Sequence, residues 1–232
     1  MRGVENGRLL FTFCMNMQNE PLLVNIGAGL SCGKSWLNFD SSLTLRISKF
    51  PLLGRVLNKL LRLPCWPAAV CYGDIVKGLP IKNDSCQLVF SSHAFEHLSF
   101  SDFERALGNV YKYLKSGGVF RVIVPDLEAY ARNYLKQLEG DGDKSSAASD
   151  FLRASGLGCE KTRVVFGSRF AEALANSRHQ WLWDRHSLIK KLQEHEFTNI
   201  KICQYSEWSD PRFAEVEDRA RHQDAVCLEC EK

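Results

Sequence analysis

The chain has 232 residues, of which 45% are hydrophobic and 25% are charged, as is ordinary for a globular protein. Its formal net charge of +3 is too small to indicate nucleic acid as a partner. No segment reaches the ~18 apolar residues that a membrane span needs, and the first residues lack a secretory signal. We therefore expect one domain over residues 1–232 in a cytoplasmic protein, with the oligomeric state left open.

The nine cysteines are odd in number and irregular in spacing. Small secreted disulfide scaffolds are denser in cysteine and more regular, so this pattern indicates reduced thiols. Cys227 and Cys230 form a CxxC pair, but no second pair stands at zinc spacing. We expect the two residues to lie in a strand.

Short apolar runs alternate with helical patterns along the chain. The runs that predict buried strands are residues 22–26, 36–39, 69–72, 87–90 and 119–124. Helical spacing follows at residues 101–114, 127–138 and 187–195, and Ser101 with Glu104 predicts a capping box for the first of these helices. A polar loop is expected at 140–149 and two closing strands at 199–204 and 224–229. Strands separated by helices favour parallel pairing in an α/β sheet.

Residues 41–73 contain several basic residues and no acidic one, with leucines between the charges. Such an amphipathic segment is typical of a helix that packs its leucines on the sheet and leaves its charges in solvent. Alternatively, it forms a lid or surface patch for an anionic substrate, or for peripheral contact with an anionic membrane.

The motif Gly27-Ala28-Gly29 follows the first predicted strand, and Asp40 follows the second. Glycines let the backbone approach a ligand closely, and a carboxylate after the second strand can accept the hydroxyls of a ribose. The third glycine of a dinucleotide fingerprint would fall at Cys32, where it is missing. The short interval to Asp40 leaves no room for a full crossover helix, since a βαβ unit takes ~30 residues. An ordinary NAD-binding fold is therefore disfavoured.

Further motifs occur in order along the chain: Tyr72-Gly-Asp-Ile75, Phe90-Ser-Ser-His-Ala-Phe-Glu-His-Leu98, Arg121-Val-Ile-Val-Pro-Asp126 and His179-Gln-Trp-Leu-Trp-Asp184. Together with Val24–Gly29 and Trp36–Asp40 they resemble class I S-adenosylmethionine-dependent methyltransferases, in a type 11-like bacterial branch with a short first helix. The resemblance covers roughly residues 22–232. It implies a Rossmann-like, mostly parallel sheet flanked by helices, an antiparallel C-terminal strand and a short or absent first crossover helix. One departure is Ala28, where the family usually has cysteine.

The resemblance implies S-adenosylmethionine as the cofactor. The glycine loop would pass the methionine part, Asp40 would accept the ribose hydroxyls, and Asp74 the adenine amino group. Ser92 would face the sulfonium. The cofactor-binding residues that it implies are Gly27, Ala28, Gly29, Asp40, Ser41, Asp74, Ile75 and Ser92. Alternatively, Asp40 is a helix N-cap or turn residue and Asp74 is a turn former after Gly73.

Candidate catalytic residues are His93, Glu96 and His97. Methyl transfer needs alignment of the reactants, and a hydroxyl acceptor also needs a base, which histidine can supply near neutral pH. Alternatively, Glu96 and His97 form a pair that braces the loop. The string His93-Ala-Phe-Glu-His97 also matches the inverted zincin motif H-x-x-E-H, but it follows a predicted strand rather than lying in a helix. We therefore expect no metal, and we keep a zinc hydrolase using His93 and His97 as a remote alternative.

The segment 140–184 is expected to be an excursion near the acceptor pocket. Its aromatic cluster, Trp181 and Trp183 with His179, belongs either to the core or to that pocket. Tyr130, Arg132 and Tyr134 are candidates for the same mouth. The expected function is methyl transfer to a small-molecule or glycan- or lipid-linked acceptor. The alternative is a non-catalytic cofactor-binding or scaffold protein, because no catalytic base is unambiguous.

Overall fold

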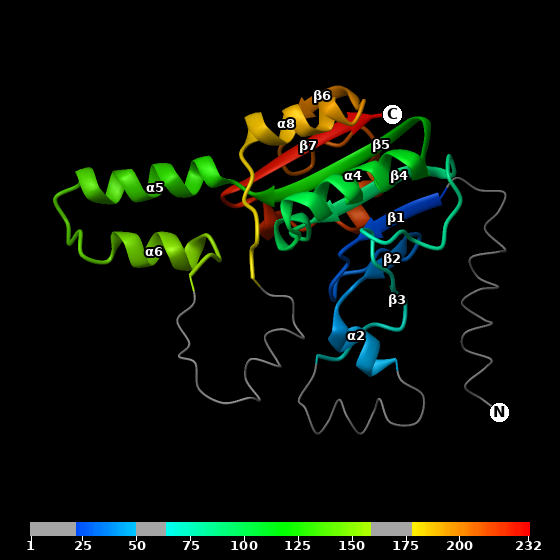
Figure 1. The fold of residues 1–232 in the computed structure, drawn as a ribbon, viewed down its shortest axis with the longest axis horizontal. Helices are drawn as coiled ribbons and strands as arrows, with labels where there is room; N and C mark the ends of the chain where they lie inside the picture. Colours follow the sequence, from blue (N-terminus) through cyan, green and yellow to red (C-terminus); the bar gives the residue numbers. More distant parts are fainter. Residues whose placement is uncertain (1–21, 50–63, 159–177) are drawn as a thin grey trace.

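The computed structural model describes residues 22–49, 64–158 and 178–232 (Figure 1). These residues form a seven-stranded sheet in the order β3-β2-β1-β4-β5-β7-β6. The strands are β1 (Leu22–Ile26), β2 (Leu37–Asp40), β3 (Val70–Tyr72), β4 (Cys86–Ser92), β5 (Leu114–Pro125), β6 (Thr198–Ile202) and β7 (Ala225–Glu231). The α-helices are α2 (Leu43–Ser48), α4 (Phe100–Tyr113), α5 (Leu127–Glu139), α6 (Ala147–Ala154) and α8 (Arg185–Glu194). Short 3-10 helices are η1 (Phe95–His97), η2 (Pro211–Glu215) and η3 (Arg219–His222).

Strands β1 to β5 pair in parallel, whereas β7 runs antiparallel to both β5 and β6. Residues 27–36, which connect β1 to β2, contain turns but no helix. The predicted fold class is therefore confirmed, including the antiparallel C-terminal strand and the missing first crossover helix.

Alternate residues of the central strands bury their side chains on opposite faces of the sheet, as the two-residue period of a strand requires. Val24, Val89 and Val122 pack on the face that α4 and α8 cover. On the other face, Leu88 and Phe90 pack against η2 through Phe213. Both faces are thus buried, which explains why these strands read as continuous apolar runs.

Helix α4 begins earlier than predicted. Ser99, rather than Ser101, is its N-cap: the backbone at Ser99 is extended, and its hydroxyl accepts a hydrogen bond from Asp102 N at 3.2 Å. The predicted capping box with Glu104 does not form, because the Glu104 carboxylate accepts from His195 and pairs with Lys191.

Two other expectations need correction. The polar segment 140–149 is not all loop, because α6 begins at Ala147, which is 1% exposed. Strand β5 begins at Leu114, five residues before the predicted start, since Leu114 already pairs with Cys86 of β4. The CxxC pair Cys227 and Cys230 lies within β7, as expected.

Only part of the basic segment 41–73 lies among the described residues, because residues 50–63 are outside them. In α2 and just after it, the two basic side chains make local contacts. The Arg46 guanidinium lies 5.5 Å from the centre of the Tyr72 ring, and Lys49 Nζ donates to Ala68 O at 3.0 Å.

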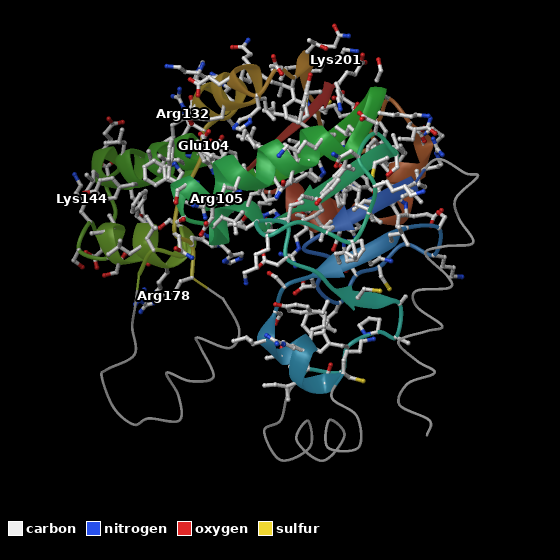
Figure 2. All side chains as sticks on the ribbon, turned by 45° about the vertical axis from the view of Figure 1, so that its right-hand side comes forward. Glu104, Arg105, Arg132, Lys144, Arg178 and Lys201 are labelled. Atoms are coloured by element: carbon white, nitrogen blue, oxygen red, sulfur yellow. The ribbon has the colours of Figure 1, made fainter. Side chains whose placement is uncertain are left out.

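Helices α5 and α6 form a hairpin that projects beyond the end of β5 (Figure 1). Its charged side chains, such as Arg132 and Lys144, are exposed (Figure 2). None of the helices in the described ranges has the length and apolar character to cross a membrane.

Candidate functional site

A cavity of about 590 Å³ opens where the parallel strands β1, β2 and β4 end. Open α/β sheets bind ligands at this edge, and the volume is typical of small-molecule sites. Nine of the predicted site residues contribute to its wall: Gly27, Ala28, Gly29, Asp40, Ser41, Ile75, Ser92, His93 and His97. Asp74 and Glu96 do not line it.

The two glycines of the loop serve different purposes. Gly27 has a φ of +69°, and a Cβ on it would lie 2.3 Å from the Cβ of Ala94. Gly29 has a φ of +56°, but a Cβ on it would meet no atom within 4 Å. Gly27 thus allows the exit of β4 to pack on the loop, whereas Gly29 meets only a backbone requirement.

Two buried asparagines hold the loop in place of the missing helix. Asn38 Oδ1 accepts from Asn25 Nδ2 at 3.1 Å and from Gly33 N at 3.2 Å. Asn38 Nδ2 donates to Gly33 O at 3.0 Å and to Trp36 O at 2.7 Å. This pair is not among the residues predicted from the sequence, although two asparagines inside otherwise apolar strands are a signal for it.

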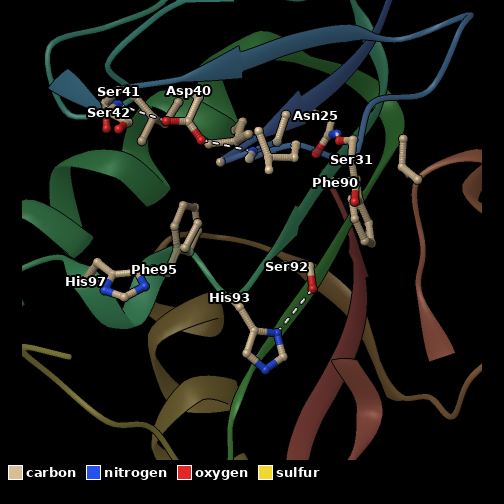
Figure 3. Close-up of a pocket in the computed structure, with 18 of the residues that line it drawn as sticks. Asn25, Ser31, Asp40, Ser41, Ser42, Phe90, Ser92, His93, Phe95 and His97 are labelled. Carbon is tan, nitrogen blue, oxygen red and sulfur yellow. Dashed lines mark hydrogen bonds between the residues drawn. The ribbon is translucent and has the colours of Figure 1, made fainter. Parts of the chain in front are cut away.

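Asp40 lies at the end of β2, across the cavity from Ser92 and His93 (Figure 3). Its Oδ2 accepts from Gly29 N at 2.9 Å, and its Oδ1 accepts from Ser42 N at 2.8 Å. The carboxylate therefore ties the glycine loop to the start of α2. Because each carboxylate oxygen has two lone pairs, both oxygens can still accept a bond from a ligand.

Ile75 and Asp74 lie in the turn after β3. Ile75 is 6% exposed and lines the cavity. The Asp74 carboxylate is directed into its own turn: Oδ1 accepts from Val76 N at 3.0 Å, and Oδ2 lies 3.0 Å from Lys77 Nζ.

His93 follows β4 with a φ of +50°, an uncommon conformation for a residue with a Cβ. Its Nδ1 lies 3.2 Å from Ser92 Oγ. Burial, with a further contribution from the positive charge of Arg221, lowers the pKa of His93 to about 4. The imidazole is therefore neutral at pH 7, and it is a weaker base than the free histidine assumed from the sequence.

Glu96 and His97 lie in η1, beside a third residue, His179. Glu96 Oε1 lies 3.9 Å from His97 Nε2 and 3.8 Å from His179 Nε2. Burial raises the pKa of Glu96 to about 8 and lowers that of His97. His93 does not belong to this cluster, and η1 is a single 3-10 turn, so the H-x-x-E-H string does not share one helix face.

The aromatic residues divide between several places. Trp183 is buried in the core beside Phe103, whereas Trp181 is 43% exposed. Tyr130 and Tyr134 line a separate hollow between α5 and α6. Among the described residues, none of these four lines the main cavity.

Two cavity residues had no signal in the sequence. Asp218 and Arg221 come from η3 and its N-cap, far along the chain from the glycine loop. Asp218 accepts from Ala220 N at 2.9 Å and thereby caps η3. Arg221 supplies a cation to the cavity, and its charge acts on His93.

Residues 57–122, less than half of the chain, match the family described as a methyltransferase domain. No curated protein matches the sequence. Among solved structures, the chain is similar to an S-adenosylmethionine-dependent methyltransferase from Thermotoga maritima, with 20% identity over 94% of this chain and 85% of that one, at a TM-score of 0.43. A methyltransferase from Archaeoglobus fulgidus has 12% identity over 100% and 95% of the two chains, at a TM-score of 0.43. Phosphoethanolamine N-methyltransferase 2 from Haemonchus contortus, solved with S-adenosylmethionine, has 12% identity over 98% of this chain and 52% of that one, at 0.46. The chain thus spans about half the length of the Haemonchus protein.

Proposed function

We propose that this chain is a class I S-adenosylmethionine-dependent methyltransferase that transfers the methyl group to a small-molecule acceptor. The observation that carries the proposal is the cavity of about 590 Å³. It combines a glycine loop and an acidic strand end on one side with Ser92, His93 and Arg221 on the other. A cavity of this kind suits a cofactor and a small acceptor side by side.

The cofactor fits the residues of the first side. The backbone of Gly27 to Gly29 offers a surface without large side chains for the methionine part. The Asp40 carboxylate retains free lone pairs for the two ribose hydroxyls, and Ile75 offers an apolar wall for the adenine ring. Asp74 supports this cofactor site less than Asp40 does, because its carboxylate already accepts a hydrogen bond from Val76 N and pairs with Lys77.

The bound cofactor supplies an electrophilic methyl group on its sulfonium. The protein's task is then to align an acceptor atom with that group and to keep competing water away. Ser92 and His93 lie at the end of β4 and are proposed to face the methyl group. Because His93 is neutral at pH 7, it can accept a hydrogen bond from an acceptor hydroxyl, or its proton as the methyl group transfers.

Arg221 favours an acceptor that carries negative charge, since it is the one arginine or lysine among the described residues that line the cavity, and its charge acts on His93. A glycan- or lipid-linked acceptor with a phosphate would satisfy this requirement, and so would a small carboxylic acid. Activity with phosphorylated and with neutral versions of one acceptor would separate charge recognition from simple size selection.

Calorimetric titration with S-adenosylmethionine and with its demethylated product tests the cofactor site. We expect both to bind, and Asp40→Ala to weaken both by about 10-fold or more, equivalent to about 1.4 kcal/mol. Asp84→Ala is the matched control, because Asp84 is exposed and pairs with Lys232 away from the cavity. Absence of binding, or equal affinity in the wild type and Asp40→Ala, would contradict the proposed site.

A scaffold protein that binds the cofactor without using it is the alternative. Each acceptor of a set is incubated with S-adenosylmethionine and either the wild type or His93→Gln. Formation of the demethylated cofactor then separates the two functions. The proposal requires turnover with at least one acceptor.

A further inference from the structure

Glu96 has an exceptional environment for a carboxylate. Its side chain is 1% exposed, and neither carboxylate oxygen has a hydrogen-bond partner among the described residues. A buried carboxylate without partners is costly, so the fold must compensate it in some other way.

His97 and His179 direct their Nε2 atoms towards Glu96 Oε1, and both atoms are hydrogen-bond acceptors rather than donors. His97 Nδ1 lies 3.0 Å from Arg178 O, and His179 Nδ1 lies 2.7 Å from Ser155 O. A carbonyl oxygen can only accept, so both Nδ1 atoms carry the hydrogen and both Nε2 atoms keep a lone pair. When Glu96 is ionised, as a metal ligand must be, its Oε1 and those Nε2 lone pairs converge with no donor between them.

We propose that Glu96, His97 and His179 bind a divalent zinc-type metal ion. Two imidazoles and one glutamate form a known zinc ligand set that leaves a position open, and the same set suits ferrous iron. The three ligand atoms lie within 4.8 Å of one another. Bonds of about 2.0–2.1 Å in tetrahedral geometry place ligand atoms about 3.3–3.4 Å apart. The 3.8 and 3.9 Å separations from Oε1 thus need to close by only roughly 0.5 Å.

The supporting structure is built to hold these rings. Glu96 O accepts from Gln180 N at 2.7 Å, and Gln180 Nε2 donates to His97 O at 2.7 Å. A Cβ on Gly156 would lie 2.6 Å from His179 Nδ1, so the backbone at the end of α6 presses on that ring. The bonds from the two Nδ1 atoms to Arg178 O and Ser155 O are outer contacts of the kind that orient metal-binding histidines and fix their tautomer.

The site adjoins the main cavity, because His97 also lines that cavity. The open coordination position would take water or, resting on the proposed function, an oxygen of the acceptor. A metal-bound oxygen loses its proton more readily, which would compensate for the weak basicity of His93. This ligand set differs from the zinc site considered from the sequence, which used His93 and His97. Here His179 and Glu96 take the place of His93.

Metal-free protein titrated with Zn²⁺ in a calorimeter tests the proposal, and Co²⁺ absorption reports the ligand type. We expect one equivalent to bind, with the visible bands of nitrogen and oxygen ligands and no strong thiolate charge-transfer band. Glu96→Gln and His179→Ala should each weaken binding by more than about 100-fold, beyond the usual cost of losing an outer contact. His195→Ala is the matched control, since His195 contacts Glu104 at 3.0 Å in a similar histidine–carboxylate pair.

Thermal unfolding of each variant without metal shows that it is folded, and the isosteric Glu96→Gln keeps the site's shape. Unchanged Zn²⁺ affinity in both ligand variants, no saturable binding, or a thiolate-dominated Co²⁺ spectrum would overturn the proposal. S-adenosylmethionine titrated into the same metal-free protein distinguishes the failures: cofactor binding without zinc binding refutes only the metal site.

Discussion

Gly27 and Ala94 lie in such close contact that a Cβ on the glycine would be 2.3 Å from the alanine Cβ. Gly27→Ala should therefore carry two costs, the left-handed backbone at φ +69° and a steric clash. We expect a loss of about 2–5 kcal/mol in the free energy of unfolding, measured with urea.

Gly117→Ala separates these two costs. Gly117 has a φ of +71°, but a Cβ on it would meet no atom within 4 Å. The backbone cost alone is about 1–2 kcal/mol. Equal losses in the two variants would show that the contact with Ala94 is not tight.

The buried Asn38 should matter both to stability and to cofactor binding. Asn38→Leu has a similar volume but leaves Gly33 N and Trp36 O without their side-chain partner, and it removes one of the two hydrogen bonds of Gly33 O and of Asn25 Nδ2. At about 1–3 kcal/mol for each unsatisfied buried group, we expect a loss of at least about 2 kcal/mol. Calorimetry should also show weaker cofactor binding, because the loop 27–36 forms part of the cavity wall.

Asn133→Ala serves as the control for this substitution. Asn133 is exposed on α5, away from the main cavity. We expect a stability change within about 0.5 kcal/mol and unchanged cofactor affinity. If Asn38→Leu behaved in the same way, the asparagine pair would not be what holds the loop.

Much of the fold could be predicted from the sequence because its signals are local. The apolar runs located the strands, and the short interval from Gly27 to Asp40 predicted that the first crossover helix is missing. Boundaries were less accurate, since Ser99 rather than Ser101 caps α4 and this depends on which hydroxyl reaches Asp102 N.

The long-range contacts could not be predicted in the same way. Glu96 and His97 were recognised, but His179 reaches them only because residues 178–181 bond to η1. Arg221 likewise lines the cavity from η3, which lies between β6 and β7 in the chain, far from the glycine loop after β1. No periodicity or motif spacing encodes such a meeting, because it depends on tertiary packing.

Arg121 on β5 should contribute strongly to stability. It is 0% exposed and donates to Glu217 Oε1 at 2.8 and 2.6 Å and to Glu229 Oε1 at 2.7 Å. Arg121→Met would leave two buried carboxylates without their cation, and we expect a loss of about 3–5 kcal/mol in urea unfolding.

Arg105→Met is the matched control on the surface (Figure 2). Arg105 pairs with Asp102 at 3.5 Å with its side chain 70% exposed, so its loss should cost at most about 1 kcal/mol. Combining Arg121→Met with Glu217→Gln should recover part of the stability. A double variant no better than Arg121→Met would argue against charge as the cause.

The thiols should differ widely in reactivity. Cys65 is exposed, whereas Cys86, Cys227 and Cys230 are buried. Burial raises the pKa of Cys86 to about 11 and also raises the pKa values of Cys227 and Cys230. Because the thiolate is the reactive form, a disulfide reagent should modify Cys65 quickly and the other three only on unfolding. Cys65→Ser should remove one equivalent from the fast phase; an unchanged fast phase would mean that Cys65 is protected.

The low pKa of His93 predicts a specific loss of stability in acid. Its folded-state pKa of about 4 lies below the ordinary value of 6.5, because of burial and then of Arg221, His179, His97 and His222. The unfolded chain therefore binds a proton that folded His93 refuses as the pH falls from 6.5 towards 4. The stability that neutral His93 contributes is fully present above pH 6.5, and it is lost progressively as the pH falls from 6.5 towards about 4.

His93→Gln should be less sensitive to acid, since glutamine does not titrate. Relative to this variant, the wild type should lose about 1–2 kcal/mol between neutral pH and the acid end of the window, after allowance for solvent screening. Thermal unfolding across a pH series, with the two proteins in parallel, measures the difference. Comparing the two cancels the titration of all other groups that the substitution leaves unchanged. Parallel profiles throughout would mean that His93 titrates alike in the folded and unfolded chains, and a steeper acid loss in His93→Gln would reverse the sign of the shift.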